Sequence, residues 1–155
     1  MERKKAEKSP FSELHHITVV VKDIERAVEF YSSLGLGPFV TPAQHEIASR
    51  TLRGKPVTSK IITREALIGP VALQLVQYIE GEHLLKEFID KKGEGVFHLG
   101  FVVDDIDKAE DKAVKLGLKV TQRARREDGS GNAFFDTEAL GGVVLEIRQN
   151  PSGRQ

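Results

Sequence analysis

The chain contains an internal repeat, and this repeat most restricts how it can fold. Residues 16–36 (HITVVVKDIERAVEFYSSLGL) align without a gap to residues 98–118 (HLGFVVDDIDKAEDKAVKLGL). A second match aligns residues 69–77 (GPVALQLVQ) with residues 141–149 (GGVVLEIRQ). Units this short bury too little apolar surface to be stable separately. We therefore expect two similar modules that share one core.

The predicted organisation follows from the repeat and from composition. The strand, helix and turn signals in each half predict the order β-α-β-β-β. The chain divides into a flexible tail at 1–12, a first module at 13–80, a linker helix at 81–95, a second module at 96–150 and a tail at 151–155. The predicted strands are 16–21, 36–41, 57–64 and 71–78, then 96–103, 118–122, 132–136 and 143–148, with a loop at 42–56.

Charge and composition exclude several classes of partner. Lys+Arg and Asp+Glu number 23 each, so no net charge attracts the chain to nucleic acid or to a membrane surface. No apolar run is long enough for a membrane span, and the charged first ten residues lack the apolar region of a signal peptide. The chain has no cysteine, which excludes disulfides, thiolate metal sites and a cysteine nucleophile. We expect a cytoplasmic protein.

Two polar side chains stand at equivalent interior strand positions. Alternation along a strand places Gln74 on the same face as Ala72 and Val76, and Glu146 on the same face as Val144. A buried amide or carboxylate is costly unless it has partners. The pattern therefore predicts a polar cavity or a bound ligand on this face.

The repeat adds two histidines to these polar groups. Taken singly, a histidine at a strand end is most often a hydrogen-bonded residue, and a glutamate or glutamine on a strand most often faces solvent. Two modules related by a pseudo-twofold axis would bring four such side chains together. These candidate metal ligands are His16, Gln74, His98 and Glu146.

This ligand set predicts one divalent ion. Imidazole nitrogen with carboxylate and amide oxygen, and without sulfur, suits Zn, Mn, Co, Ni or Fe(II). Four protein ligands would leave two positions of an octahedral site for substrate or water. The alignment selects His16 rather than His15, because His98 matches it and because adjacent side chains of a strand point to opposite faces. We expect His15 to be partly exposed.

Basic residues gather in the predicted loop and third strand of the first module. They allow two interpretations, a solvated surface or a docking surface for an anionic substrate such as a coenzyme A phosphate. These residues are Arg50, Arg53, Lys55, Lys60 and Arg64.

Residues 14–150 resemble the vicinal oxygen chelate superfamily, which includes glyoxalase I, methylmalonyl-CoA epimerase, extradiol dioxygenases, and fosfomycin and bleomycin resistance proteins. The resemblance lies in HHITVVVKDIERAVEFYSSLGL (15–36), FHLGFVVDDIDKA (97–109) and GGVVLEI (141–147). It implies an α+β fold in which two tandem β-α-β-β-β modules curl into a half-open barrel, forming one glyoxalase-like domain around one divalent metal. It assigns ligand roles to His16, Gln74, His98 and Glu146, in an order that is similar to that of the epimerases.

The resemblance also implies a leading function. We expect a divalent-metal-dependent epimerase or isomerase that forms an enolate from an acyl-CoA such as methylmalonyl-CoA, in a homodimer. Glu146 would leave the metal transiently to transfer one proton. Epimerases carry a glutamate base in the region that here reads PAQHEIASRTLRGKPVTS (42–59), where Glu46 is the nearest candidate for the second proton transfer.

Three alternatives remain open on the same residues. The first is a lyase of the glyoxalase I type. The second is a metal-free protein that binds an antibiotic or another small molecule, for which eight phenylalanines but only two tyrosines and no tryptophan are available. The third is an extradiol-type dioxygenase that holds Fe(II) with His16, His98 and Glu146.

Overall fold

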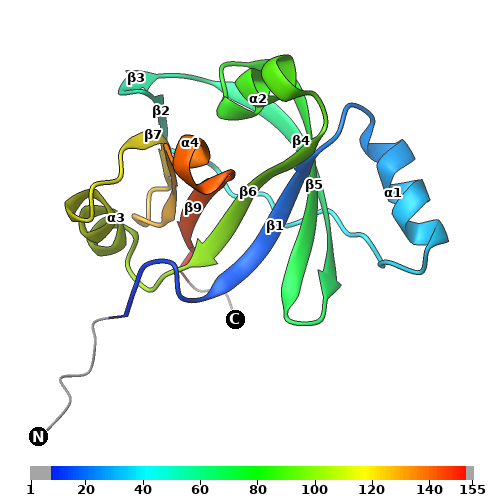
Figure 1. The fold of residues 1–155 in the computed structure, drawn as a ribbon, viewed down its shortest axis with the longest axis horizontal. Helices are drawn as coiled ribbons and strands as arrows, with labels where there is room; N and C mark the ends of the chain where they lie inside the picture. Colours follow the sequence, from blue (N-terminus) through cyan, green and yellow to red (C-terminus); the bar gives the residue numbers. More distant parts are fainter. Residues whose placement is uncertain (1–7, 153–155) are drawn as a thin grey trace, which may run out of the picture.

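A computed structural model describes residues 8–152 of the chain. A single nine-stranded sheet curls into a half-open barrel, with strand order β3-β2-β7-β8-β9-β6-β1-β5-β4 (Figure 1). Strands β1 and β6 lie antiparallel where the two modules meet, and each is parallel to the last strand of its own module, β5 or β9. The strands are β1 Leu14–Val20, β2 Ser49–Leu52, β3 Lys55–Pro56, β4 Ser59–Ile68, β5 Val71–Gly81, β6 Gly95–Val102, β7 Val120–Arg125, β8 Gly131–Phe135 and β9 Val144–Gln149. The helices are α1 Ile24–Ser33, α2 Leu84–Lys92, α3 Ile106–Lys115 and α4 Glu138–Gly141.

The two modules repeat one another in hydrogen bonding as well as in sequence. The Gln77 side-chain oxygen accepts from the backbone N–H of Ile24, which opens α1, at 2.9 Å. Gln149 makes the same bond to Ile106, which opens α3, at the same distance. The α+β fold with paired modules in a half-open barrel, which the sequence resemblance implied, is therefore confirmed.

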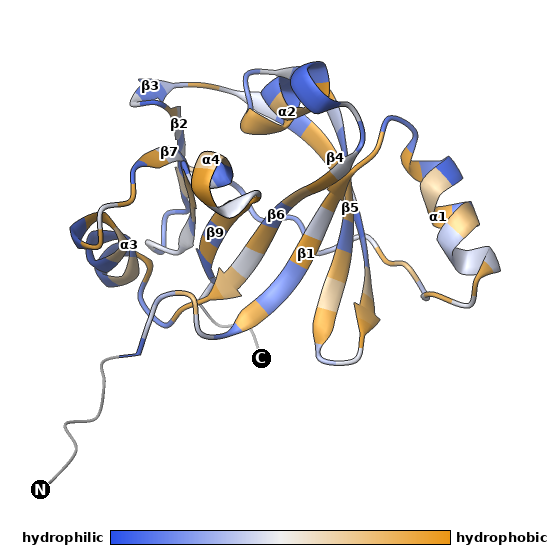
Figure 2. Cartoon of the chain, in the orientation of Figure 1, coloured by the Kyte–Doolittle hydropathy of each residue, from blue (hydrophilic) through white to orange (hydrophobic). Residues whose placement is uncertain are grey.

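Each module covers the outside of its sheet with one amphipathic helix. Helix α1 contributes Ile24 to a cluster with Val21 and Leu75, and α3 contributes Ile106 to a cluster with Ile147. Figure 1 shows the two helices at opposite ends of the molecule, and Figure 2 shows hydrophobic and hydrophilic residues alternating around each of them. Burial of one helical face drives this packing.

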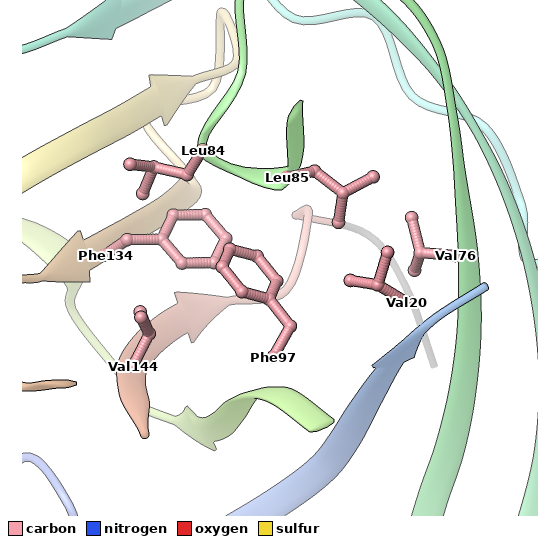
Figure 3. Close-up of a cluster of buried hydrophobic side chains, with 7 residues drawn as sticks. All are labelled: Val20, Val76, Leu84, Leu85, Phe97, Phe134 and Val144. Atoms are coloured by element: carbon pink, nitrogen blue, oxygen red, sulfur yellow. The ribbon is translucent and has the colours of Figure 1, made fainter. Parts of the chain in front are cut away.

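The concave side of the sheet holds a third cluster. The rings of Phe97 and Phe134 stack with centroids 6.1 Å apart, and the linker helix α2 covers them with Leu84 and Leu85 (Figure 3). The other buried members are Val20, Val76 and Val144. This apolar plug fills one part of the half-barrel and leaves a polar cavity beside it.

The segment at 36–56 differs from the prediction. The expected strand at 36–41 is reduced to a single bridge between Val40 and Glu65. The expected loop at 42–56 instead contains the hairpin β2–β3, which pairs with β7 of the other module. Its turn, Arg53-Gly54, has positive φ at both residues, as two-residue hairpins prefer. The sequence did not predict the hairpin, because arginine is an uncommon first residue of such a turn and because the pairing with β7 is long-range.

Ordered contacts extend beyond the predicted module boundaries. Phe11, placed in the predicted tail at 1–12, packs edge-on against Phe101 and Phe135, with centroid distances of 5.5 and 5.8 Å. At the other end, the Ser152 backbone N–H donates to Asp128 at 2.7 Å. The rest of the two predicted tails, 1–7 and 153–155, lies outside the described residues. None of the helices between residues 8 and 152 combines the length and apolarity needed to cross a membrane.

Candidate metal centre

Three of the four predicted ligands meet inside the half-barrel. His16 of β1, His98 of β6 and Glu146 of β9 are each at most 5% exposed, and their candidate ligand atoms all lie within 4.8 Å of one another. The Nε2 atoms of the two histidines are 2.9 Å apart. The Glu146 carboxylate oxygens lie 3.4 Å from His16 Nε2 and 3.3 Å from His98 Nε2. All three side chains come from one chain.

A glycine makes room for this arrangement. Gly100 stands opposite His16 on the neighbouring strand. A Cβ atom at Gly100 would lie 2.0 Å from Cε1 of the His16 ring. Only a residue without a side chain leaves room for the His16 ring at this position. The equivalent residue of the first module is Thr18, whose hydroxyl contacts His98 Nε2 at 3.0 Å.

The three side chains fit a divalent cation. Ligand atoms about 2.1 Å from a cation are roughly 3.0–3.4 Å from one another in octahedral and tetrahedral sites. The separation of 2.9 Å between the two histidine nitrogens, and those of 3.3 and 3.4 Å between these nitrogens and the carboxylate oxygens, lie close to this range. Two imidazoles and one carboxylate also form a donor set typical of Zn, Mn, Co, Ni and Fe(II).

Burial shifts the pKa values of all three groups. It lowers the pKa of His98 to about 3 and also lowers the pKa of His16, with added repulsion from Arg148, so both imidazoles are uncharged at neutral pH. Burial raises the pKa of Glu146 to about 8, although Arg148 and Arg126 oppose this shift. A cation bound among the three groups would supply the positive charge that favours the ionised form of Glu146.

Gln74 lies beside the centre and is engaged with two other groups. Its side-chain oxygen accepts from Thr18 at 3.3 Å, and its side-chain nitrogen donates to Glu65 at 3.0 Å. Thr18 in turn contacts His98, so Gln74 is linked to the centre through one hydroxyl. Gln74 lines the same cavity as the three ligands, and its role as a fourth ligand stays a prediction.

His15 is half-buried, and its ring contacts His16. The two Nδ1 atoms are 2.8 Å apart, and the rings meet edge-on with centroids 5.1 Å apart. Strict alternation predicted opposite faces, but the pairing of β1 with β6 shifts register between Leu14 and His16. This irregularity brings neighbouring side chains together. By contrast, the buried Nδ1 of His98 has no hydrogen-bond partner.

The structure separates the two predicted proton-transfer residues. Glu146 is in the centre, whereas Glu46 is exposed in the segment before β2 and does not line the cavity. The carboxylate that does adjoin the cavity in the first module is Glu65, through its hydrogen bond with Gln74. It stands opposite Gln74 in the β4–β5 pairing, a relation that the sequence shows only once the hairpin register is known.

The cavity beside the centre has a volume of about 160 Å³ and several polar residues that the sequence analysis did not select. The predicted basic cluster is divided: Arg50 lines this cavity, whereas Arg53 pairs with Glu87 and Arg64 pairs with Glu25 on the surface. Alternation from Glu146 could have identified Arg148, which is two residues further along the same strand. The polar residues of this cavity that sequence reasoning missed are His83, Gln122, Arg126, Asn132 and Arg148.

Comparisons with known proteins agree with this geometry. The profile of the Glyoxalase/Bleomycin resistance protein/Dioxygenase superfamily matches residues 15–135, which is more than half of the chain, so the chain belongs to this superfamily. It is 24% identical to YqjC, an uncharacterized protein of Bacillus subtilis (strain 168), over 92% of this chain and 94% of that protein.

Solved structures with a similar fold include methylmalonyl-CoA epimerases. The enzyme from Mycobacterium tuberculosis is 20% identical with a TM-score of 0.68, covering 94% of this chain and 92% of that chain. A Streptomyces coelicolor methylmalonyl-CoA epimerase in complex with 2-nitronate-propionyl-CoA is 23% identical with a TM-score of 0.69, covering 94% and 99%. At these identities the likeness establishes the fold.

Proposed function

We propose that this chain is a divalent-metal-dependent epimerase or isomerase that moves a proton at a carbon next to a carbonyl group. The observation that carries the proposal is the convergence of His16, His98 and Glu146, whose buried ligand atoms lie within 4.8 Å of one another. A divalent ion held there would act as a Lewis acid on two neighbouring substrate oxygens and stabilise an enolate. Gln74 would either be a fourth ligand or lie outside the ligand shell. Its hydrogen bonds to Thr18 and Glu65 favour the second role.

Two carboxyl groups are placed to move the proton. Glu146 touches both histidines and reaches the cavity directly. Glu65, which is hydrogen-bonded to Gln74, is better placed for the second transfer than the exposed Glu46. General bases must reach the proton within hydrogen-bond distance, which favours groups that adjoin the cavity.

The proposed substrate is an acyl-CoA such as methylmalonyl-CoA. Support comes from the fold shared with methylmalonyl-CoA epimerases. A cavity of about 160 Å³ suits a short acyl group, with the coenzyme A portion lying outside it. The homodimer remains a prediction of the family resemblance, and the candidate centre is already assembled within one chain.

One observation favours a second candidate. The residues brought together are two histidines and one carboxylate, a set that holds Fe(II) in ring-cleaving dioxygenases and leaves several positions open. A fourth protein ligand would occupy one of those open positions and so argue against this function. Gln74 is instead hydrogen-bonded to Thr18 and Glu65, which leaves the position open. The arginines of the cavity fit an uncharged aromatic diol less well than an anion.

The first experiment measures metal content by mass spectrometry on protein purified without added metal, together with the His98→Ala variant. We expect about one divalent ion per native chain and a strong loss in the variant. The metal-loaded protein is then incubated with methylmalonyl-CoA in D₂O, and exchange of the α-proton is followed by NMR. Exchange that requires both the metal and Glu146 supports the proposal.

Other outcomes select the alternatives. Turnover of a methylglyoxal–thiol adduct without exchange on the acyl-CoA would identify a glyoxalase I-type lyase. Oxygen consumption with a catechol after anaerobic Fe(II) loading would identify the dioxygenase. No binding of Co, Mn, Zn or Fe(II) at all would refute the proposed enzyme and leave a metal-free binding protein.

A further inference from the structure

Three arginines converge on the cavity of the candidate metal centre from separate parts of the chain. Arg50 comes from β2, Arg126 from the turn after β7, and Arg148 from β9. Among the described residues that line the cavity, Glu146 is the only acidic one. The lining therefore has a clear excess of positive charge.

Two arginines of this cavity, Arg50 and Arg148, differ from most arginines elsewhere in the described chain. Arg53 and Arg64 each have a carboxylate partner, and Arg123 and Arg125 share Glu110. Among the described residues, neither Arg50 nor Arg148 has a carboxylate within ion-pair distance.

The side-chain hydrogen bonds of Arg50 and Arg148 go to neutral groups. Arg50 Nη1 donates to Ser59 Oγ at 3.0 Å, and Arg148 Nη2 donates to Asn150 Oδ1 at 2.9 Å. The Nε atoms of both arginines are buried and have no hydrogen-bond partner. Both side chains are half-buried. A buried donor without a partner is costly, and it costs more on a charged group. Two half-buried guanidinium groups with buried, unbonded Nε atoms facing one cavity therefore favour an anion in that cavity.

We propose that Arg50, Arg126 and Arg148 bind a carboxylate of the substrate, so that the metal centre acts on a small organic acid. The planar guanidinium fork matches a carboxylate and forms charge-assisted hydrogen bonds with it. Arg148 is two residues from Glu146 on the same strand, so the bound carboxylate would lie next to the candidate metal ligands. This inference rests on the proposed function, and it names the substrate class of the same site.

The size of the cavity limits the acid. About 160 Å³ accommodates a short acid and no large ring system. The hairpin β2–β3 contributes Arg50 only because it crosses to β7 of the second module. The hairpin of the first module thus supplies one arginine of the proposed substrate site, and the second module supplies the other two.

The test measures ligand binding to metal-free protein by calorimetry, with malonate as probe and malonamide as its uncharged counterpart. We expect malonate to bind and malonamide to bind at least about tenfold more weakly, because each charge-assisted bond is worth more than a neutral one. Arg148→Gln and Arg50→Gln should each weaken malonate binding about tenfold. Arg53→Gln, on the same hairpin but paired with Glu87 outside the cavity, is the matched control and should leave binding unchanged.

A second measurement separates ligand binding from a structural role. Thermal unfolding without ligand should show Arg148→Gln as stable as the native protein or more stable, because the substitution removes a half-buried charge that has no carboxylate partner among the described residues. Malonate should raise the unfolding temperature of native protein and Arg53→Gln, and raise it less in Arg148→Gln.

Several results would overturn the inference. They are equal malonate binding by Arg148→Gln and Arg53→Gln, equal affinity for malonate and malonamide, or inorganic phosphate binding more than tenfold tighter than malonate. Because metal is absent from this assay, a failure here leaves the proposed metal chemistry standing. Conversely, malonate binding by a protein that takes up no metal would support the arginine site and refute the enzyme.

Discussion

The two modules share one backbone plan but contribute unequally to the candidate site. The second module supplies two of the three converging ligands, His98 and Glu146, from a complete set of four strands. The first supplies His16, and at the position of Glu146 it has Gln74, which is bonded to Thr18 and Glu65. A repeat therefore predicts equivalent positions, while the chemistry at each position depends on its own neighbours.

The largest expected effect compares the two equivalent positions directly. Glu146→Gln keeps the size of the side chain but removes its charge, and we expect metal affinity to fall by more than about 1,000-fold and proton exchange to be lost. Gln74→Ala should weaken metal binding by about 10–100-fold, as loss of an outer-shell group does. Metal content and competition with a chelator measure both. Equal losses in the two variants would contradict the asymmetry and identify Gln74 as a direct ligand.

A smaller effect is expected where the modules differ by one side chain, at Gly100 and its counterpart Thr18. Gly100→Ala places a methyl group 2.0 Å from the His16 ring, so the ring must move. We expect metal affinity to fall about 100-fold, and overpacking to lower the unfolding free energy by about 1–3 kcal/mol. Gly141→Ala is the control, because a Cβ there meets nothing within 4 Å. Unchanged metal binding by Gly100→Ala would show that the site tolerates a displaced His16.

The sequence predicted the parts of the site that depend on period and repetition. Strand alternation placed Gln74 and Glu146 towards the interior, and the repeat distinguished His16 from His15. It could not predict the β2–β3 hairpin, and hence the entry of Arg50, because the polar segment SRTL has no apolar alternation and its partner β7 is distant in the chain. Glu65 was missed for a related reason, since its contact with Gln74 depends on the register of the hairpin.

A third prediction concerns pH, where only one of the equivalent positions can titrate. Burial raises the pKa of Glu146 to about 8, whereas Gln74 carries no titratable group. Below pH 8 the carboxyl group is protonated and a metal must displace that proton. Metal affinity should therefore fall about tenfold per pH unit below 8 and level off above it. The histidines add little, because their lowered pKa values keep them uncharged.

Calorimetry with Mn²⁺ in two buffers of different ionisation enthalpy counts the protons released. We expect about one per ion at pH 6.5 and few at pH 9. Affinity that does not change between pH 6 and 8 would mean that Glu146 is already ionised before the metal binds. Neither Glu146 nor its counterpart Gln74 would then change protonation in this pH range, and the two modules would not differ in this respect.

The smallest effect is expected where the modules are most alike, at the helix N-caps. Asp23 accepts from the Arg26 backbone N–H at 3.1 Å, and Asp105 accepts from Lys108 at 3.0 Å. Asp23→Ala and Asp105→Ala should each lower the unfolding free energy by about 1 kcal/mol, because each exposes one helix donor. Denaturant unfolding measures both, and metal affinity should stay unchanged. If one substitution lowered the unfolding free energy much more than the other, the modules would differ in stability as well as in chemistry. A shared backbone plan would then not imply equal contributions to stability.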